Sequence, residues 1–213
     1  MRRRPDWNLY LVTDRLLAGG RPIEDVIAAA VRGGVSVVQL REKQAGTRQF
    51  VELGRKCLAL LRALGIPLII NDRVDVALAV GADGVHIGQE DMEYAMARQL
   101  LGPEAIIGLS VETPGQAEEP EARAVDYLGV GPIFSTPTKP DAAAAWGLER
   151  LRELRARSGQ VLVAIGGIGT ANAAQVIEAG ADGLAVVSAI CAAPDPEQAA
   201  RELCREIARG RAR

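Results

Sequence analysis

Eight short apolar segments recur along the chain, and helix-like stretches separate them. The apolar segments are rich in Val, Ile and Leu and end at turn residues, which is typical of buried strands. They cover residues 9–13, 35–40, 67–70, 84–87, 105–109, 127–130, 161–165 and 183–187. Amphipathic helices are predicted where Ala, Leu, Arg and Glu occur at helical spacing, as in residues 23–32, 47–64, 92–101 and 171–179.

The number of these units selects a fold class. Eight strand–helix units in 213 residues leave roughly 27 residues for each unit, near the minimum for a (β/α)8 barrel of about 200 residues. Doubly wound sheets rarely need eight such repeats. No linker or low-complexity segment interrupts the pattern. We therefore predict an α/β fold, a (β/α)8 TIM barrel, in which residues 1–213 form a single domain.

Composition and charge narrow the classes of function. Hydrophobic residues make up 48% of the chain and charged residues 24%, which permits a sizeable core and excludes a disordered or fibrous protein. The formal net charge of -2 provides no overall field that would attract nucleic acid or an anionic membrane. Small molecules bound in a local site are the expected partners, and the oligomeric state, homo-oligomers included, stays open.

Cysteine spacing and the first residues indicate the compartment. Cys57, Cys191 and Cys204 are widely spaced and include no C-x-x-C pair, so neither a disulfide framework nor a structural zinc site is expected. The arginines at 2–4 precede Pro-Asp-Trp-Asn instead of the apolar run of a signal peptide. No later segment is long enough to span a bilayer. We expect a cytoplasmic protein.

The tetrapeptide Gly-Ala-Asp-Gly occurs twice, at residues 81–84 and 180–183. Each copy joins the end of a predicted helix to a strand, where glycine is the expected C-terminal cap. In a barrel such turns lie on the bottom face, which serves stability, so Asp83 and Asp182 are expected to be structural. Functional residues are expected at the opposite ends of the strands.

Polar side chains end the second predicted strand. Gln39, Arg41 and Lys43 occupy alternate positions and therefore project to one side. An amide and two cations on one side favour an anion-binding pocket over a solvated strand end. Lysine occurs elsewhere only at Lys56 and Lys139, which indicates either a need for a compact ammonium at loop positions or chance.

Carboxylates follow the next two strands. Asp72 comes after the third strand, beside Asn71, and Asp91 follows the fourth. Each is suited both to capping the helix that follows and to holding Mg²⁺, which proteins bind with one or two carboxylates and substrate phosphates. His86 lies inside the fourth strand, where a hydrogen-bonded core histidine is favoured over a general base.

The longest connection follows the sixth strand, in a place where barrels carry mobile lids. Its Thr136, Thr138 and Lys139 suit phosphate binding, and an ordinary Ser/Thr/Pro-rich loop is the alternative. A hydroxyl, Ser110, also ends the fifth strand, although one such residue is a weak signal.

Glycines and a hydroxyl end the last two strands. Gly166 and Gly167 follow the seventh strand, and Val187 and Ser188 end the eighth. Loops after these strands recurrently bind phosphate in barrels, while a tight turn is the alternative explanation for the glycines. Together with the cationic residues that end the second predicted strand, this gives two anion sites, which predict two phosphorylated substrates.

No Ser-His-Asp set, Cys/His metal cluster or G-x-G-x-x-G helix start is present, which disfavours hydrolase triads, zinc chemistry and nicotinamide binding.

Six ordered segments together resemble the thiamine phosphate synthase family, from near residue 9 to residue 190. They are QLREK at 39–43, INDR at 70–73, HIGQED at 86–91, VGPIFSTPTKP at 130–140, IGGI at 165–168 and VVSAI at 186–190. Glu112 stands where family members often have His or Asn.

The resemblance implies a transferase of thiamine biosynthesis. Such an enzyme joins 4-amino-2-methyl-5-hydroxymethylpyrimidine diphosphate to 4-methyl-5-(2-hydroxyethyl)thiazole phosphate, giving thiamine phosphate and pyrophosphate. Departure of pyrophosphate leaves a pyrimidinylmethyl cation that the thiazole nitrogen captures, so anion stabilisation matters more than a general base.

The resemblance also implies roles for individual residues. It places Gln39, Arg41, Lys43, Asn71, Ser110 and Lys139 at the pyrimidine diphosphate, with Arg41, Lys43, Ser110 and Lys139 as the catalytic residues. Thr136, Thr138, Gly167, Val187 and Ser188 surround the thiazole phosphate, and Asp72 and Asp91 hold Mg²⁺. Two alternatives are a thiazole tautomerase-like isomerase, which needs no diphosphate half, and a non-catalytic phosphoester-binding barrel.

Overall fold

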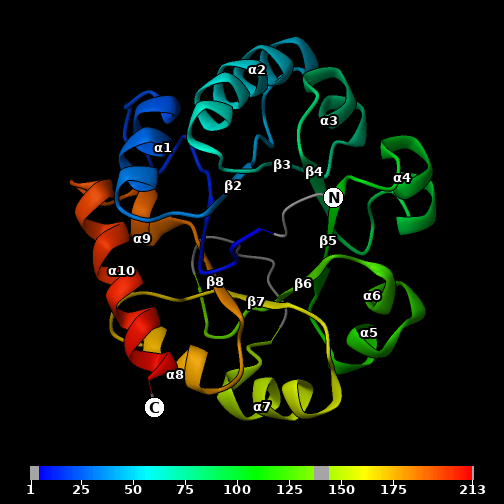
Figure 1. Cartoon of the computed structure of the whole chain (residues 1–213), viewed down its shortest axis with the longest axis vertical. Coiled ribbons are helices and arrows are strands. Elements are labelled where there is room, and N and C mark those ends of the chain that lie inside the picture. Colours follow the sequence, from blue (N-terminus) through cyan, green and yellow to red (C-terminus); the bar gives the residue numbers. More distant parts are fainter. Residues whose placement is uncertain (1–4, 137–143, 213) are drawn as a thin grey trace.

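Eight parallel strands close into a barrel, and helices surround it (Figure 1). The computed structural model describes residues 5–136 and 144–212. The strands are β1 (Leu9–Val12), β2 (Val37–Leu40), β3 (Leu68–Asn71), β4 (Gly84–Ile87), β5 (Ile106–Val111), β6 (Tyr127–Val130), β7 (Leu162–Ile165) and β8 (Gly183–Val186). Strands adjacent in sequence are adjacent in space, and β1 pairs with β8. This order confirms the predicted TIM barrel.

Helices connect the strands on the outside of the barrel. In the described residues they are α1 (Ile23–Arg32), α2 (Thr47–Leu64), α3 (Val74–Val80), α4 (Tyr94–Leu101), α5 (Pro114–Glu118), α6 (Pro120–Ala124), α7 (Gly147–Arg157), α8 (Ala173–Glu178), α9 (Ser188–Cys191) and α10 (Pro196–Arg211). The bounds of α1 and α2 match the prediction, whereas α4 starts later and α8 is shorter. The last helix, α10, packs beside α1 and α8 and so completes the outer ring (Figure 1).

Apolar side chains form two layers on either side of the barrel wall. The larger layer fills the space between strands and helices. The smaller one fills the barrel interior and consists of Tyr10, Val12, Val37, Ile69, Ile106, Tyr127, Val163 and Ala185. Trp7 packs against this inner layer, with its ring centroid 4.5 Å from that of Tyr127. Burial on both faces explains why most strands are continuous apolar runs.

A repeated hydrogen bond ties the strands together in pairs at their amino-terminal ends. Just before each even-numbered strand, a polar side chain accepts a hydrogen bond from a backbone amide at the start of the preceding strand. The four bonds are Leu9 N to Ser36 Oγ (3.1 Å), Leu68 N to Asp83 Oδ2 (2.9 Å), Ile107 N to Asp126 Oδ2 (2.8 Å) and Leu162 N to Asp182 Oδ2 (2.8 Å). Asp83 and Asp182 thus lie where the sequence predicts structural residues.

The two Gly-Ala-Asp-Gly turns differ at the helix end. Gly81 is the left-handed C-cap of α3, with φ 70°, as predicted. The C-cap of α8 is Ala179, and Gly180 follows it with φ 104°. The capping prediction is therefore right for the first turn and one residue late for the second.

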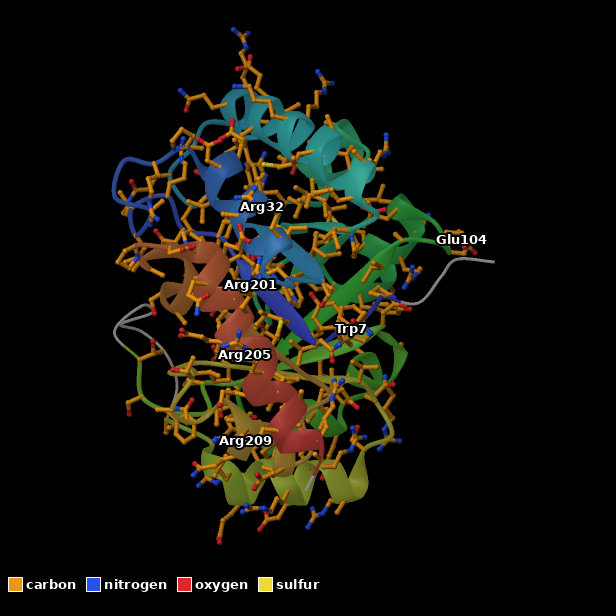
Figure 2. All side chains as sticks on the ribbon, turned by 60° about the vertical axis from the view of Figure 1, so that its left-hand side comes forward. Trp7, Arg32, Glu104, Arg201, Arg205 and Arg209 are labelled. Carbon is orange, nitrogen blue, oxygen red and sulfur yellow. The ribbon has the colours of Figure 1, made fainter. Side chains whose placement is uncertain are left out.

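Arginines line the outer surface of α10 (Figure 2). Arg32 Nε lies 2.8 Å from Glu197 Oε2, Arg201 also pairs with Glu197, and Arg209 pairs with Glu206. Acidic neighbours therefore offset much of this positive charge. Among the described residues, no helix is both long and apolar enough to cross a membrane. The three cysteines of the chain are free thiols.

Candidate active site

A cavity of about 600 Å³ opens at the carboxyl-terminal ends of the strands. Residues of all eight strands or of the loops that follow them line it. It brings together every described residue of the predicted site: Gln39, Arg41, Lys43, Asn71, Asp72, Asp91, Ser110, Thr136, Gly167, Val187 and Ser188. The other two predicted residues, Thr138 and Lys139, lie outside the described residues.

Charged residues after β2 and β3 lie at one side of this cavity. Lys43 Nζ is 2.5 Å from Asp72 Oδ2. The backbone amide of Asp72 donates to the carbonyl oxygen of His86 (2.8 Å) and fixes the residue next to β4. Asp72 has φ 60°, a left-handed conformation that non-glycine residues seldom adopt and that Asp and Asn tolerate best. The backbone therefore places this carboxylate at the mouth at some conformational cost.

Asp91 provides the second carboxylate. Its Oδ2 accepts a hydrogen bond from the amide of Gly88 (2.7 Å). Burial raises the pKa of Asp91, and the nearby negative charge of Asp72 raises it further. A bound cation would offset the negative charge of Asp72 that disfavours ionisation of Asp91.

The helix-capping interpretation of these two carboxylates is wrong. Arg73 is the N-cap of α3 and Glu93 is the N-cap of α4. Asp91 instead caps the local turn at Gly88, and this explains why α4 begins later than residue 92. Both carboxylates are left facing the cavity.

Five side chains form a hydrogen-bonded chain across the barrel interior. Gln39 Nε2 donates to Tyr10 Oη (3.0 Å), and Tyr10 Oη lies 2.7 Å from Tyr127 Oη. Tyr127 Oη lies 2.8 Å from His86 Nδ1, and His86 Nε2 lies 2.8 Å from Ser110 Oγ. We call these five residues the interior polar chain. Because β5 extends to Val111, Ser110 is within a strand rather than after one.

Burial sets the ionisation of the interior polar chain. It lowers the pKa of His86 to about 4, an effect that the negative charge of Asp72 opposes only weakly. Burial also raises the pKa of Tyr10 and of Tyr127 above the usual tyrosine value. His86 is therefore neutral near physiological pH and both tyrosines keep their protons. Since both ring nitrogens of His86 have partners, the core-histidine interpretation fits the structure.

Two glycines make room for these rings. A Cβ at Gly108 on β5 would overlap the Tyr127 ring, and one at Gly129 on β6 would lie 2.8 Å from His86 Cε1. Sequence reasoning missed Tyr10 and Tyr127 as cavity residues, although they are two of only three tyrosines and stand at inward positions of buried strands. That scarcity is the signal that could have identified them.

The other side of the cavity is made by glycines and hydroxyls. Gly166 and Gly167 have φ 101° and 64°, and a Cβ on Gly167 would lie 2.8 Å from Phe134 Cβ. Asn172 Nδ2 donates to the carbonyl oxygen of Gly167 (2.9 Å) and holds the loop. Position 167 therefore requires glycine, because the packing is tight and the backbone faces the cavity. Ser188, the first residue of α9, lies at the same rim of the cavity.

The described ends of the long connection after β6 are held together. The amide of Trp146 donates to the carbonyl oxygen of Pro132 (2.8 Å). Trp146 Nε1 donates to the carbonyl oxygen of Glu112 (2.8 Å), and the amide of Glu112 donates to Gln116 Oε1 (2.7 Å). The backbone of Glu112 thus anchors the base of this connection beside the cavity.

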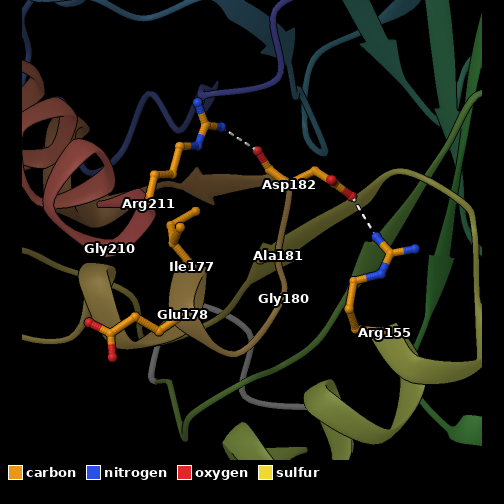
Figure 3. Close-up of a pocket in the computed structure, with 8 residues that line it drawn as sticks. All are labelled: Arg155, Ile177, Glu178, Gly180, Ala181, Asp182, Gly210 and Arg211. Atoms are coloured by element: carbon orange, nitrogen blue, oxygen red, sulfur yellow. Dashed lines mark hydrogen bonds and ion pairs between the residues drawn. The ribbon is translucent and has the colours of Figure 1, made fainter. Parts of the chain in front are cut away.

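A second cavity, of about 650 Å³, lies at the opposite end of the barrel (Figure 3). Arg155 and Arg211 approach Asp182 from two sides. Arg155 Nη1 is 2.9 Å from Asp182 Oδ2, and Arg211 Nη2 donates to the carbonyl oxygen of Asp182 (2.7 Å). Because both arginines are already bound to the protein, this cavity has the character of a structural junction.

Comparisons with known proteins agree with the site. The sequence profile of the thiamine monophosphate synthase family matches residues 9–190. The chain is 59% identical over 195 residues to a thiamine-phosphate synthase of Albidiferax ferrireducens, covering 92% of this chain and 89% of the relative. It is 55% identical over 198 residues to a thiamine-phosphate synthase of Syntrophomonas wolfei, covering 93% and 95%.

A solved structure of a similar enzyme has the same fold as this chain. The thiamine phosphate pyrophosphorylase from Pyrococcus furiosus superposes with a TM-score of 0.88 at 40% sequence identity, over 97% of this chain and 98% of that one. Fold, cavity and sequence point in one direction: the chain is a transferase that belongs to the thiamine monophosphate synthase family.

Proposed function

We propose that the chain condenses 4-amino-2-methyl-5-hydroxymethylpyrimidine diphosphate with 4-methyl-5-(2-hydroxyethyl)thiazole phosphate, forming thiamine phosphate and releasing pyrophosphate. The observation that carries this proposal is the division of one cavity into two unlike sides. Cations and carboxylates from the ends of β2, β3 and β4 line one side, and glycines and hydroxyls from the ends of β6, β7 and β8 line the other.

The cationic side suits the diphosphate. Arg41 and Lys43 bring two positive charges to the cavity, and pyrophosphate leaves with roughly three to four negative charges near neutral pH. Fixed cations stabilise charge that grows on a leaving group, a contribution of about a hundredfold or more in rate per group. Lys139, which lies outside the described residues, is assigned to the same task from the sequence alone.

The carboxylate pair fits Mg²⁺. Asp72 and Asp91 both face the cavity, and the negative charge of Asp72 raises the pKa of Asp91. Magnesium is usually held by one or two carboxylates, with waters and substrate phosphates in the remaining positions. When bound, the ion would neutralise charge on the diphosphate. In the structure Lys43 pairs with Asp72, so Lys43 would move toward the diphosphate as the ion takes its place.

The glycine and hydroxyl side suits the thiazole phosphate. Backbone amides near Gly167 and Ser188 lie where barrels recurrently bind phosphate, and Val187 offers an apolar surface for a ring. Thr136 adds a hydroxyl, and Thr138 is expected to add another from outside the described residues. The main role of this side of the cavity is to hold the nucleophilic thiazole ring in line with the reactive carbon.

The test is direct formation of product. Both substrates are mixed with the protein and Mg²⁺, and pyrophosphate and thiamine phosphate are measured together, with each substrate omitted in turn as the control. Equal amounts of the two products, dependent on both substrates, are expected. Conversion of a thiazole phosphate alone would favour the tautomerase-like isomerase, and tight binding with no conversion would favour the phosphoester-binding barrel. We also expect a cytoplasmic protein, in keeping with its free cysteines.

A further inference from the structure

The interior polar chain connects five strands that are not all neighbours. It begins at Gln39 on β2, passes through Tyr10 on β1 and Tyr127 on β6, and reaches Ser110 on β5 through His86 on β4. All but Ser110 are buried. Ser110 is partly exposed and lines the cavity, so it is the point at which the chain meets a ligand.

The available protons determine which atom donates and which accepts at each step of the interior polar chain. The amide nitrogen of Gln39 can only donate, so Tyr10 Oη accepts there. A phenol has one proton, and within the described residues the acceptor available to Tyr10 is Tyr127 Oη. Tyr127 must then donate to His86 Nδ1. A neutral imidazole that accepts at Nδ1 carries its proton on Nε2, which donates to Ser110 Oγ.

The opposite direction is less favourable with this orientation of Gln39. If Tyr127 donated to Tyr10, the buried Tyr10 hydroxyl would have no acceptor for its own proton among the described residues, and buried donors are nearly always paired. A doubly protonated His86 would also break the sequence, because it donates from both nitrogens. The ring is buried and the partners of its two nitrogens are neutral hydroxyls, and such surroundings favour the neutral imidazole.

We propose that His86 is a positioning residue: protonated on Nε2, it donates to Ser110 Oγ and thereby directs the Ser110 hydroxyl proton into the cavity. Ser110 then acts as a donor and selects a substrate that places a hydrogen-bond acceptor against it. The assignment of that acceptor to the pyrimidine diphosphate rests on the proposed function. The direction of hydrogen bonding along the interior polar chain does not rest on the proposed function, because it follows from the protein's own side chains.

The direction of hydrogen bonding in the interior polar chain can be tested cleanly, because His86 is the only histidine of the protein. Long-range proton–nitrogen correlation spectra of the protein, freed of any histidine tag, report which ring nitrogen carries the proton. We expect a single neutral form protonated on Nε2 near neutral pH, without any ligand. Protonation on Nδ1, or a mixture of both forms, would overturn the proposal.

A pair of tyrosine variants tests whether the whole chain sets this state. Tyr127→Phe removes the donor to Nδ1, so the Nδ1 resonance should shift and the two neutral forms should mix. Tyr94→Phe is the matched control, because Tyr94 lies on α4 and contacts Arg98 instead. An unchanged His86 spectrum in Tyr127→Phe would contradict the proposed direction.

Kinetics then test the effect on Ser110. Tyr127→Phe should lower kcat/KM for the pyrimidine diphosphate about tenfold, leaving KM for the thiazole phosphate little changed. In a Ser110→Ala background the same change should have almost no further effect, because the residue it positions is gone. Equal losses in both backgrounds would refute positioning through Ser110. If the unaltered protein forms no thiamine phosphate at all, the proposed function fails, while the spectra still decide the direction of the chain.

Discussion

Acidification should destabilise this protein through one buried side chain. His86 is neutral in the folded protein because burial lowers its pKa to about 4, whereas an unfolded histidine titrates near its model value of 6.5. Between these values the unfolded chain binds a proton that the folded chain does not. Stability from this group is therefore intact above the unfolded pKa and is lost as pH falls toward the folded pKa. From about pH 7 to about pH 5 the free energy of unfolding should fall by about 2 kcal/mol on account of His86 alone.

The assay is urea unfolding at several pH values, with His86→Gln as the reference protein. Four carboxyl groups with shifted pKa values also respond to acid: burial raises those of Glu42 and Asp91, and arginine partners lower those of Asp75 and Glu197. They are present in both proteins, so their effects cancel in the difference between the two stability curves. That difference should shrink by about 2 kcal/mol over the same interval.

Two results would refute the reasoning. One is a difference between the curves that does not depend on pH. The other comes from the unaltered protein, where the single histidine can be titrated by nuclear magnetic resonance: a pKa near the ordinary value would mean that water reaches the ring. This second measurement needs no variant, so it decides the matter even if His86→Gln does not fold.

Four further perturbations test the two halves of the cavity and the interior packing. Asp72→Asn, which tolerates the left-handed backbone of this residue, should lower product formation at least about a hundredfold at ordinary Mg²⁺, and undiminished turnover would exclude a metal ligand at this position. Ser188→Ala should raise KM for the thiazole phosphate more than KM for the pyrimidine diphosphate, and equal effects in initial-rate assays would argue against two separate halves. Lys139→Ala should cost roughly a hundredfold in kcat, whereas Lys56→Ala on α2 should cost less than about tenfold; indistinguishable losses would leave Lys139 without a catalytic role. Gly108→Ala should destabilise the protein by about 3 kcal/mol in urea unfolding because its Cβ overlaps the Tyr127 ring, and a fully stable variant would show that the ring can move aside.

The barrel was predictable because its signals are local and repeated. Each strand is an apolar run, and the 18 residues of α2 carry a long amphipathic pattern, so the bounds of α2 could be predicted to the residue. The start of α4 was not, because Asp91 looks like a capping residue in sequence but hydrogen bonds to the amide of Gly88. A carboxylate has several nearby amides to choose from, and only the folded backbone decides between them.

In the candidate site, too, residues grouped within one strand were predictable from the sequence, whereas contacts between distant strands were not. Gln39, Arg41 and Lys43 could be grouped from their alternation, which is a property of a single strand. Tyr10 and Tyr127 could not be joined to His86 and Ser110, because their contact depends on the order and register of distant strands. Asp126 also escaped notice, since it lacks the Gly-Ala-Asp-Gly sequence of its two counterparts even though it makes the same bond to a strand amide.

The hydrogen bonds at the bottom of the barrel have a consequence for where the chain can be divided. Ser36, Asp83, Asp126 and Asp182 each join β-strands within the pairs β1–β2, β3–β4, β5–β6 and β7–β8. A break after α4, between β4 and β5, would leave all four bonds inside one fragment or the other. A break between β5 and β6 would separate Asp126 from the Ile107 amide that donates a hydrogen bond to it. Two half-barrels cut at the first point should reassemble more readily than two pieces cut at the second, and circular permutants should follow the same preference.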